Sequence, residues 1–194
     1  MIAEVFKFLR EHLNEALPRD SAGGAVEDLF VYVGSGKEDA VSFKADAVSL
    51  LLVRVEQDAT LRPPDLYTRI SSVGSHQKVE PEIRLNLSLL LVARFPDDYL
   101  QALHHLSRVI RYFQNHRVFN PANAPDLPDG ISQLVLELVT PTFSEQNEIW
   151  GTLRTAYLPS AMYKLRMVVF QDDEGQPTTA VKELMQSVTQ VPQT

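Results

Sequence analysis

The residues from Glu82 to Phe119 constrain the fold most, because they predict a long strand that runs directly into a long helix. In the strand, apolar side chains occupy alternate positions, namely Leu85, Leu87, Leu89, Leu91, Ala93 and Phe95. The polar residues Asn86, Ser88 and Arg94 fall on the opposite parity. This period of two predicts a strand with one fully buried face.

The helix predicted after this strand carries apolar residues at steps of three and four. They are Leu100, Leu103, Leu106, Ile110 and Phe113. Residues with this spacing lie along one side of a helix. We therefore expect this stripe to pack on the sheet, with Asp97 and Asp98 at the positive N-terminal end of the helix.

The rest of the chain supplies partners for this unit. Periodicity predicts a helix over residues 2–17 and strands over residues 29–33, 48–56, 131–139 and 162–170. Thr142 and Glu145 have the spacing of a capping box, which predicts a further helix that extends to Tyr157. Together these elements predict a soluble α+β domain.

Two segments have only a weak pattern. Residues 65–81 are predicted to be a loop or an irregular hairpin arm outside the main core. Residues 172–194 form a C-terminal tail with two open interpretations, a docked interaction arm or a disordered end. The main domain is accordingly predicted to span residues 1–171.

Composition excludes several kinds of chemistry. The 194 residues include no cysteine, which excludes disulfides, thiolate nucleophiles and cysteine-bound metal centres. A net charge of −7 argues against general binding to nucleic acid or to an anionic membrane, since such surfaces need clustered Lys and Arg. No apolar run reaches the length of a membrane span. We therefore expect a soluble, cytosolic protein.

No motif predicts a catalytic, cofactor or metal site. His104 and His105 are adjacent, so they diverge on a helix, and no further ligand follows at helical spacing. The loop from Gly34 to Lys37 departs from the phosphate-binding motif at two positions, Val31 and Glu38, so a turn between strands is expected there. We expect no cofactor and no enzymatic activity.

His12 is also interpreted without a chemical role. Glu11 and Glu15 flank it on the predicted N-terminal helix. Charged neighbours at this spacing predict a solvated helix face rather than an acid–base site.

Several local sequences, in their order along the chain, are characteristic beyond their periodicity. They are Asn86 inside the long strand, the helix that ends in Phe113-Gln114, and Leu158-Pro159-Ser160 followed by Tyr163-Lys164. With the N-terminal helix, they resemble the tail terminator (cap) family of phage-tail-like contractile injection systems. The resemblance covers about residues 1–170, and none of these sequences is a catalytic motif.

The resemblance implies one α+β domain in which a mixed or largely antiparallel sheet is flanked by about three helices. It also implies a homohexameric ring on the distal end of the inner tube and sheath that ends their polymerisation. The implied partners are further copies of the chain, the sheath and tube proteins and, where a system has one, a second cap paralogue. Neither nucleic acid nor direct membrane contact is implied. Assembly would occur in the cytoplasm, and the protein would then stay in the particle.

Five residues are candidates for partner contacts. Arg84, Lys164 and Arg166 are basic residues on strand faces of an acidic protein, and ordinary solvent-facing charges are the alternative interpretation. Val188 and Val191 lie in the tail segment 186–192, which is a candidate for adding a strand to an adjacent subunit. The alternative function is an adaptor or assembly chaperone of the same type of machine, without a ring.

Overall fold

The computed structural model describes residues 1–19, 27–35, 41–58, 68–70, 76–78, 84–169 and 176–177. The chain divides into two compact units, which we describe separately. The first comprises Met1–Thr60 and Glu82–Phe170, and the second comprises Leu61–Pro81 and Gln171–Thr194.

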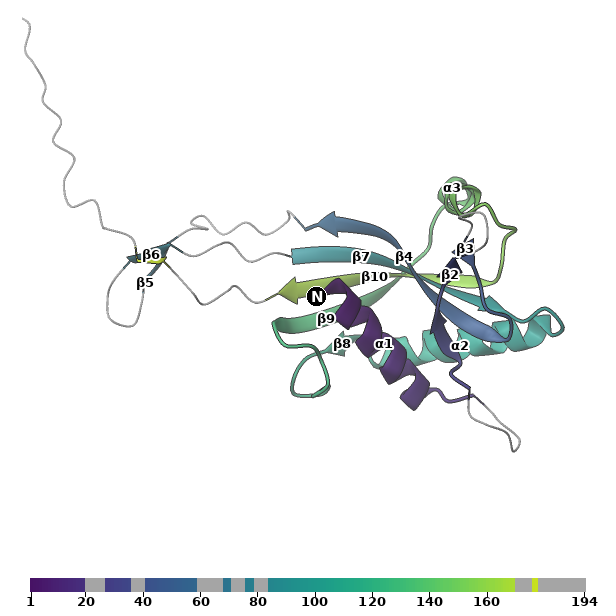
Figure 1. The fold of residues 1–194 in the computed structure, drawn as a ribbon, viewed down its shortest axis with the longest axis horizontal. Coiled ribbons are helices and arrows are strands. Elements are labelled where there is room, and N and C mark those ends of the chain that lie inside the picture. The colour runs from purple at the N-terminus through teal and green to yellow at the C-terminus, as the bar shows by residue number, and fades with distance from the viewer. Residues whose placement is uncertain are drawn as a thin grey trace, which may run out of the picture. The chain divides into compact units, whose positions relative to one another are not determined.

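A six-stranded sheet forms the centre of the first unit, with the strand order β1-β4-β7-β10-β9-β8 (Figure 1). Its strands are β1 (Phe30–Tyr32), β4 (Ala47–Gln57), β7 (Arg84–Arg94), β8 (Val118–Phe119), β9 (Ile131–Val139) and β10 (Ser160–Val169). Only β1 and β4 pair in parallel, and the other pairs are antiparallel. The expected α+β fold with a mixed sheet and three helices is confirmed.

The predicted long strand is β7, which lies between β4 and β10 near the middle of the sheet. Leu87, Leu89 and Leu91 are fully buried, as their alternation predicts. We call the side of the sheet that carries these three residues the covered face. It packs against α1 (Ile2–Ala16) and α2 (Tyr99–Asn115) in one apolar core that includes Leu9 and Phe113.

The predicted apolar stripe of α2 is wrong in part. Leu106 and Phe113 are buried, but Leu100, Leu103 and Ile110 are 75%, 38% and 36% exposed. The buried side of α2 consists of Ala102, His105, Leu106, Val109 and Phe113. This helix carries apolar residues on two sides, and small Ala102 and Val109 let the other side approach the sheet closely. Asp98 caps its N-terminus as expected, because its side chain accepts a hydrogen bond from the Gln101 amide.

Helix α3 (Phe143–Leu153) packs on the opposite side of the sheet from α2 (Figure 1). Trp150 forms a small second core there with Phe43, Leu90 and Val92. The predicted capping box between Thr142 and Glu145 is present.

The predicted end of α3 at Tyr157 is wrong. Arg154 has a left-handed backbone with φ of 52°, which ends the helix after Leu153. Tyr157 is 56% exposed, and its ring meets the Trp150 ring edge to face at 5.4 Å.

A short hairpin precedes β4. Strand β2 (Gly34–Ser35) pairs with β3 (Val41–Ser42) in antiparallel register. Gly34 and Ser35, the first two residues of the segment that departs from the phosphate-binding motif, therefore form a strand, and Gly36 and Lys37 lie outside the described residues.

The second unit contains a three-stranded antiparallel sheet of β11 (Gln176–Pro177), β6 (His76–Lys78) and β5 (Thr68–Ile70), in that order. The pairing of β5 with β6 agrees with the hairpin interpretation of residues 65–81. Val188 and Val191 lie outside the described residues. Across the described residues, no helix is both long and apolar enough to span a membrane.

Candidate assembly surfaces

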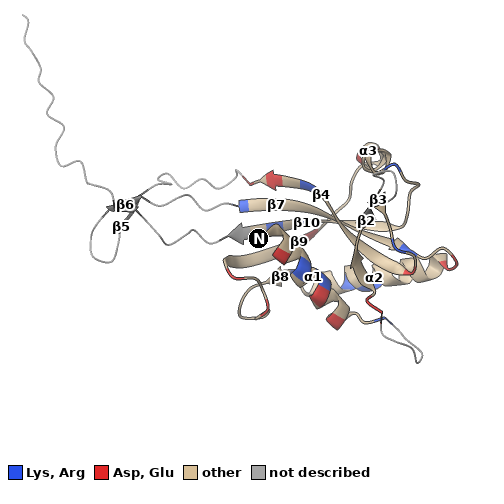
Figure 2. Ribbon diagram, viewed as in Figure 1, with Lys and Arg blue, Asp and Glu red and all other residues tan. Residues whose placement is uncertain are grey.

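The side of the sheet that α3 only partly covers carries a row of polar residues, which we call the polar strip. It consists of Arg54, Glu56, Arg84, Asn86, Ser88, Glu137, Lys164 and Arg166. The register puts these residues on one side, since Lys164 lies opposite Ser88 and Glu137, and Arg166 lies opposite Asn86. Figure 2 shows basic and acidic positions on the adjacent strands β4, β7 and β10.

The structure brings together the three basic residues predicted from the sequence. Arg166 is exposed and forms an ion pair with Glu137, whereas Lys164 and Arg84 are half-buried. Arg84 lies opposite Val168 on β10, two positions beyond Arg166. Strand alternation indicates which residues of one strand share a side, but the arrangement across strands required the register.

The polar strip carries charges of both signs. Besides the ion pair of Arg166 and Glu137, Arg54 pairs with Glu56 at 2.6 Å on β4. A partner that presents both signs in the matching order would fit this strip, and a uniformly charged polymer would not.

Asn86 is the buried member of the polar strip. Its side chain is 7% exposed, and its Oδ1 atom has no hydrogen-bond partner among the described residues. The register places Glu56 opposite it on β4 and Arg166 opposite it on β10. A buried acceptor without a donor is unfavourable, so a donor from a partner would stabilise this position.

A second surface is apolar and follows from the corrected stripe of α2. Ile110, Leu138 and Tyr157 are exposed and line a groove of about 260 Å³, together with Pro141 and Ile149. Leu103 lies two turns before Ile110 on the same side of α2. Sequence periodicity missed this groove, because it assigned Leu103 and Ile110 to the core.

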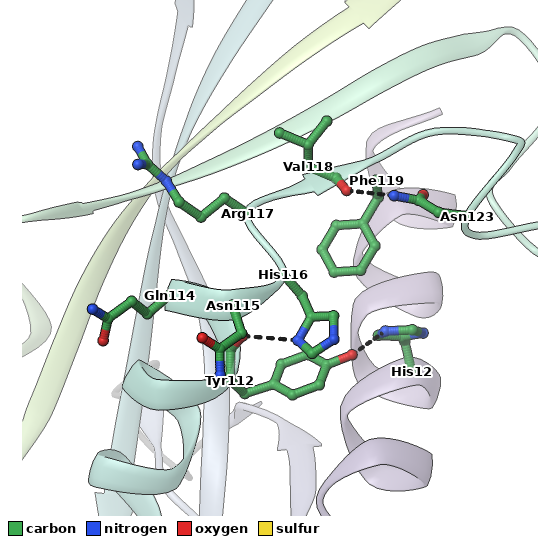
Figure 3. Close-up of a pocket in the computed structure, with 9 residues that line it drawn as sticks. All are labelled: His12, Tyr112, Gln114, Asn115, His116, Arg117, Val118, Phe119 and Asn123. Carbon is green, nitrogen blue, oxygen red and sulfur yellow. Dashed lines mark hydrogen bonds between the residues drawn. The ribbon is translucent and has the colours of Figure 1, made fainter.

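A third surface is an open pocket of about 530 Å³ where α1 and α2 meet (Figure 3). His12 Nε2 lies 2.6 Å from the Tyr112 hydroxyl. The His12 ring also stacks on Phe8 and meets Phe119 edge to face. The expectation of a solvated helix face is therefore wrong in part, because Glu11 and Glu15 are exposed but the aromatic contacts of His12 leave its ring half-buried.

Burial is the main influence on the ionisation of this pair. It lowers the pKa of His12, an effect that Glu15 partly opposes, and it raises the pKa of Tyr112. The nine residues that line the pocket include no carboxylate, Ser or Thr. The pair connects α1 to α2, and the hydroxyl in this lining is that of Tyr112, which is already hydrogen-bonded to His12.

No group of three or more His, Asp or Glu side chains is arranged to hold a metal ion in the described part of the chain. His105 is buried and stacks on Phe95, whereas His104 is exposed. One histidine of the adjacent pair therefore packs in the core, and the other lies at the surface.

The first unit is an α+β domain with one mixed six-stranded sheet and three helices. The sequence model of the family described as Pvc16 N-terminal domain matches residues 4–183. The chain belongs to this family.

Two solved structures share the fold. The first is the sheath/tube terminator of the extracellular contractile injection system PVC in its extended state. It is 19% identical over 100% of this chain and 66% of that chain, with a TM-score of 0.59. The second is the tube-terminating cap of the anti-feeding prophage, 20% identical over 96% of this chain and 59% of that chain, with a TM-score of 0.51.

This chain therefore spans less than two thirds of the length of either structure. No curated protein sequence matches it at a significant level.

Proposed function

We propose that this protein is a structural cap, or terminator, of a contractile injection system, and that it ends the growth of the inner tube and sheath. One observation carries the proposal. The chain belongs to the Pvc16 N-terminal domain family and has the fold of a sheath/tube terminator. The similar fold of a tube-terminating cap adds support. In this role the protein acts by contact and catalyses no reaction.

The proposed working form is a homohexameric ring on the distal end of the particle. A ring of identical subunits needs an interface that joins two different surfaces of neighbouring copies. One side of the ring would match the end of the tube or sheath, and the other would offer no site for the next layer. Growth would stop there.

Within this ring we assign the polar strip to contacts with the sheath or tube. Arg84, Lys164 and Arg166 lie together there, and the Asn86 Oδ1 atom, which has no partner among the described residues, can accept a hydrogen bond from a subunit that docks on the strip. A surface with charges of both signs sets register and selects its partner more than it adds affinity. Val188 and Val191 would contribute a strand from the C-terminal tail to the adjacent subunit. Assembly would take place in the cytoplasm, and the ring would remain in the finished particle.

The length of the particles tests the cap function. In a producing strain that lacks this chain, we expect sheaths and tubes of variable and greater length, measured by electron microscopy. The wild-type chain should restore the uniform length. Sheaths of unchanged, uniform length in the strain without the chain would refute the cap function.

The double variant Lys164→Glu/Arg166→Glu tests the polar strip. It reverses two charges on the strip, so we expect it to restore uniform length poorly. Lys7→Glu changes an exposed lysine on α1 and should restore length as well as the wild type does. Equal restoration by the two variants would remove the polar strip from the proposal.

Native mass measurement separates the cap from the adaptor or chaperone alternative. A ring should have a mass of six times 21.8 kDa, alone or when released from particles. A monomer or dimer that binds one machine component saturably, with no ring in either sample, would favour the adaptor.

A further inference from the structure

The edges of the sheet in the first unit differ in whether a side chain occupies their outward-facing backbone groups. Strand β1 forms one edge, and both outward backbone groups of Phe30 are occupied by Asn14 from α1. The Asn14 Nδ2 atom donates to the Phe30 carbonyl at 2.9 Å, and the Phe30 amide donates to Asn14 Oδ1 at 2.9 Å. This side chain takes the place of a neighbouring strand.

The opposite edge is blocked by the same residue type. Strand β8 forms this edge, and the Nδ2 atom of Asn123 donates to the Val118 carbonyl at 2.8 Å. Natural sheets protect their edges because a row of unpaired N–H and C=O groups recruits another strand.

Among the described residues, none protects the outer half of β4 in this way. Strand β1 pairs with β4 only from Val48 to Leu50, and no strand among the described residues pairs with the same side of β4 beyond that point. Exposure rises where β1 ends, and Val53 and Val55 are 36% and 46% exposed. Figure 1 shows this half of β4 at the border of the sheet.

The register identifies the backbone groups that face outward. The Asp58 amide donates to the Arg84 carbonyl, and Arg54 and Glu56 are the register partners of Ser88 and Asn86 on β7. In an antiparallel strand, successive residues direct their backbone groups to alternate sides. Val55 and Gln57 therefore direct their N–H and C=O groups away from β7, at an edge with exposed β-branched side chains.

We propose that this edge of β4, from Val53 to Gln57, accepts the C-terminal segment Gln186–Pro192 of a neighbouring copy as an added β-strand. The proposal rests on the proposed ring, because it assigns one of the interfaces between its subunits. In this arrangement the donor segment would pair with the edge of β4, and its β-branched side chains would pack against the exposed valines of the acceptor.

Three properties of the donor segment fit this edge. Residues 186–194 contain no charged side chain, so no charge is desolvated against Val53 and Val55. Val188, Thr189 and Val191 are β-branched residues, which favour strands. Pro192 lacks an N–H group, so the added ladder would end at Val191. The seven residues of the segment exceed the five of the acceptor edge.

Disulfide mapping tests the contact directly, because the chain has no cysteine of its own. Particles are assembled from two forms, Val55→Cys and a size-tagged Val188→Cys or Thr189→Cys, and are then oxidised. We expect the crosslink yield to be about tenfold higher with Val55→Cys as acceptor than with Val118→Cys. A docked strand raises the effective concentration of the tail thiol near position 55. Val118 is a matched control, because it is 36% exposed on the edge that Asn123 blocks.

Two outcomes of the mapping would overturn the proposal. One is an equal crosslink yield with Val55→Cys and Val118→Cys as acceptors. The other is a product that forms only when both cysteines are in one chain, which would show that the tail occupies its own edge.

A backbone variant gives a second, independent test. Val55→Pro removes an N–H group that faces away from β7, so the six-stranded sheet should persist while the added strand loses a hydrogen bond. We expect Val55→Pro to lose ring assembly and Val55→Ala, which keeps the N–H, to retain most of it. Rings formed normally by Val55→Pro would overturn the proposal.

The two levels of the proposal fail in different ways. If sheaths lengthen without the chain but Val55→Pro caps them normally, the edge contact is wrong and the cap function stands. If sheath length does not depend on the chain, the cap function fails and the ring contact fails with it.

Discussion

The two faces of the central sheet differ in how completely the chain buries them. On the covered face, helices α1 and α2 enclose Leu87, Leu89 and Leu165, all of which are fully buried. On the other face, as far as the described residues show, α3 covers the end around Trp150 and the polar strip occupies the remainder. The comparison separates two tasks: the covered face stabilises the fold, and the other face is available for contacts with partners.

The largest effect should come from removing a side chain of the covered face. Leu165→Ala leaves a cavity in a closed core, so we expect a loss of about 3 to 4 kcal/mol in the free energy of unfolding. Arg166→Ala, the next residue on the same strand, should change it by less than about 0.5 kcal/mol, because it is exposed on the polar strip. Denaturant unfolding measures both. Similar losses of unfolding free energy in the two variants would contradict the difference between the two faces.

The second prediction concerns the contact through which α1 protects the sheet edge. Asn14→Ala leaves the amide and carbonyl of Phe30 without their partner, so we expect a loss of about 1 to 2 kcal/mol in unfolding free energy. Gln114→Ala, at an exposed position of α2, serves as a control and should have little effect. An unfolding free energy unchanged by Asn14→Ala would mean that water replaces the amide without penalty.

The third prediction concerns a polar atom that is buried in the covered face, the hydroxyl of Tyr163. Tyr163 is 2% exposed, its hydroxyl has no hydrogen-bond partner among the described residues, and burial raises its pKa to about 12. Tyr163→Phe deletes only this oxygen, so stability should stay equal or rise by up to about 1 kcal/mol. A clear fall in the unfolding midpoint would reveal a partner for the hydroxyl, such as a bound water.

The smallest effect should be the pH dependence of the contact between α1 and α2. Burial lowers the pKa of His12 below its model-peptide value of 6.5, with Glu15 and Asp126 opposing this shift and His116 adding to it. The unfolded chain then binds more protons than the folded chain at mildly acidic pH. Stability is therefore complete above pH 6.5 and declines as the pH falls through that value toward the folded pKa.

Unfolding curves measured across this pH range should show the decline in the wild type and a weaker one in His12→Gln. Identical pH profiles of the two proteins would contradict this role for His12. A decline that is stronger in the variant would mean that other groups dominate the profile.

Much of the fold was predictable because its strands alternate strictly. The strand predicted over 131–139 is Ile131–Val139 in the structure, and the capping box between Thr142 and Glu145 is present. The error in α2 has a physical reason. Leu103 and Ile110 form as regular an apolar stripe as the residues that are buried, and periodicity alone does not indicate which side faces the sheet.

The candidate surfaces were less predictable than the fold. The neighbourhood of Arg84, Lys164 and Arg166 depends on the register of two strands that lie far apart in the sequence. The open edge of β4 depends on where β1 stops pairing, and the contact between Asn14 and Phe30 depends on how α1 docks. These are tertiary properties, so no local pattern in the sequence carries them.

The register shift between Leu52 and Arg54 has a consequence for insertions and deletions. Leu52 lies opposite Leu89 and Arg54 lies opposite Ser88, which are consecutive residues of β7. Val53 therefore has no residue opposite it and is the extra residue of a β-bulge. Losing a residue elsewhere in a strand exchanges its inner and outer side chains. Losing Val53 would instead convert the bulge into a regular ladder with every other residue on its present side. A codon deletion at this position should therefore be tolerated, whereas a deletion several positions earlier in β4 would exchange the sides of the residues between it and the bulge.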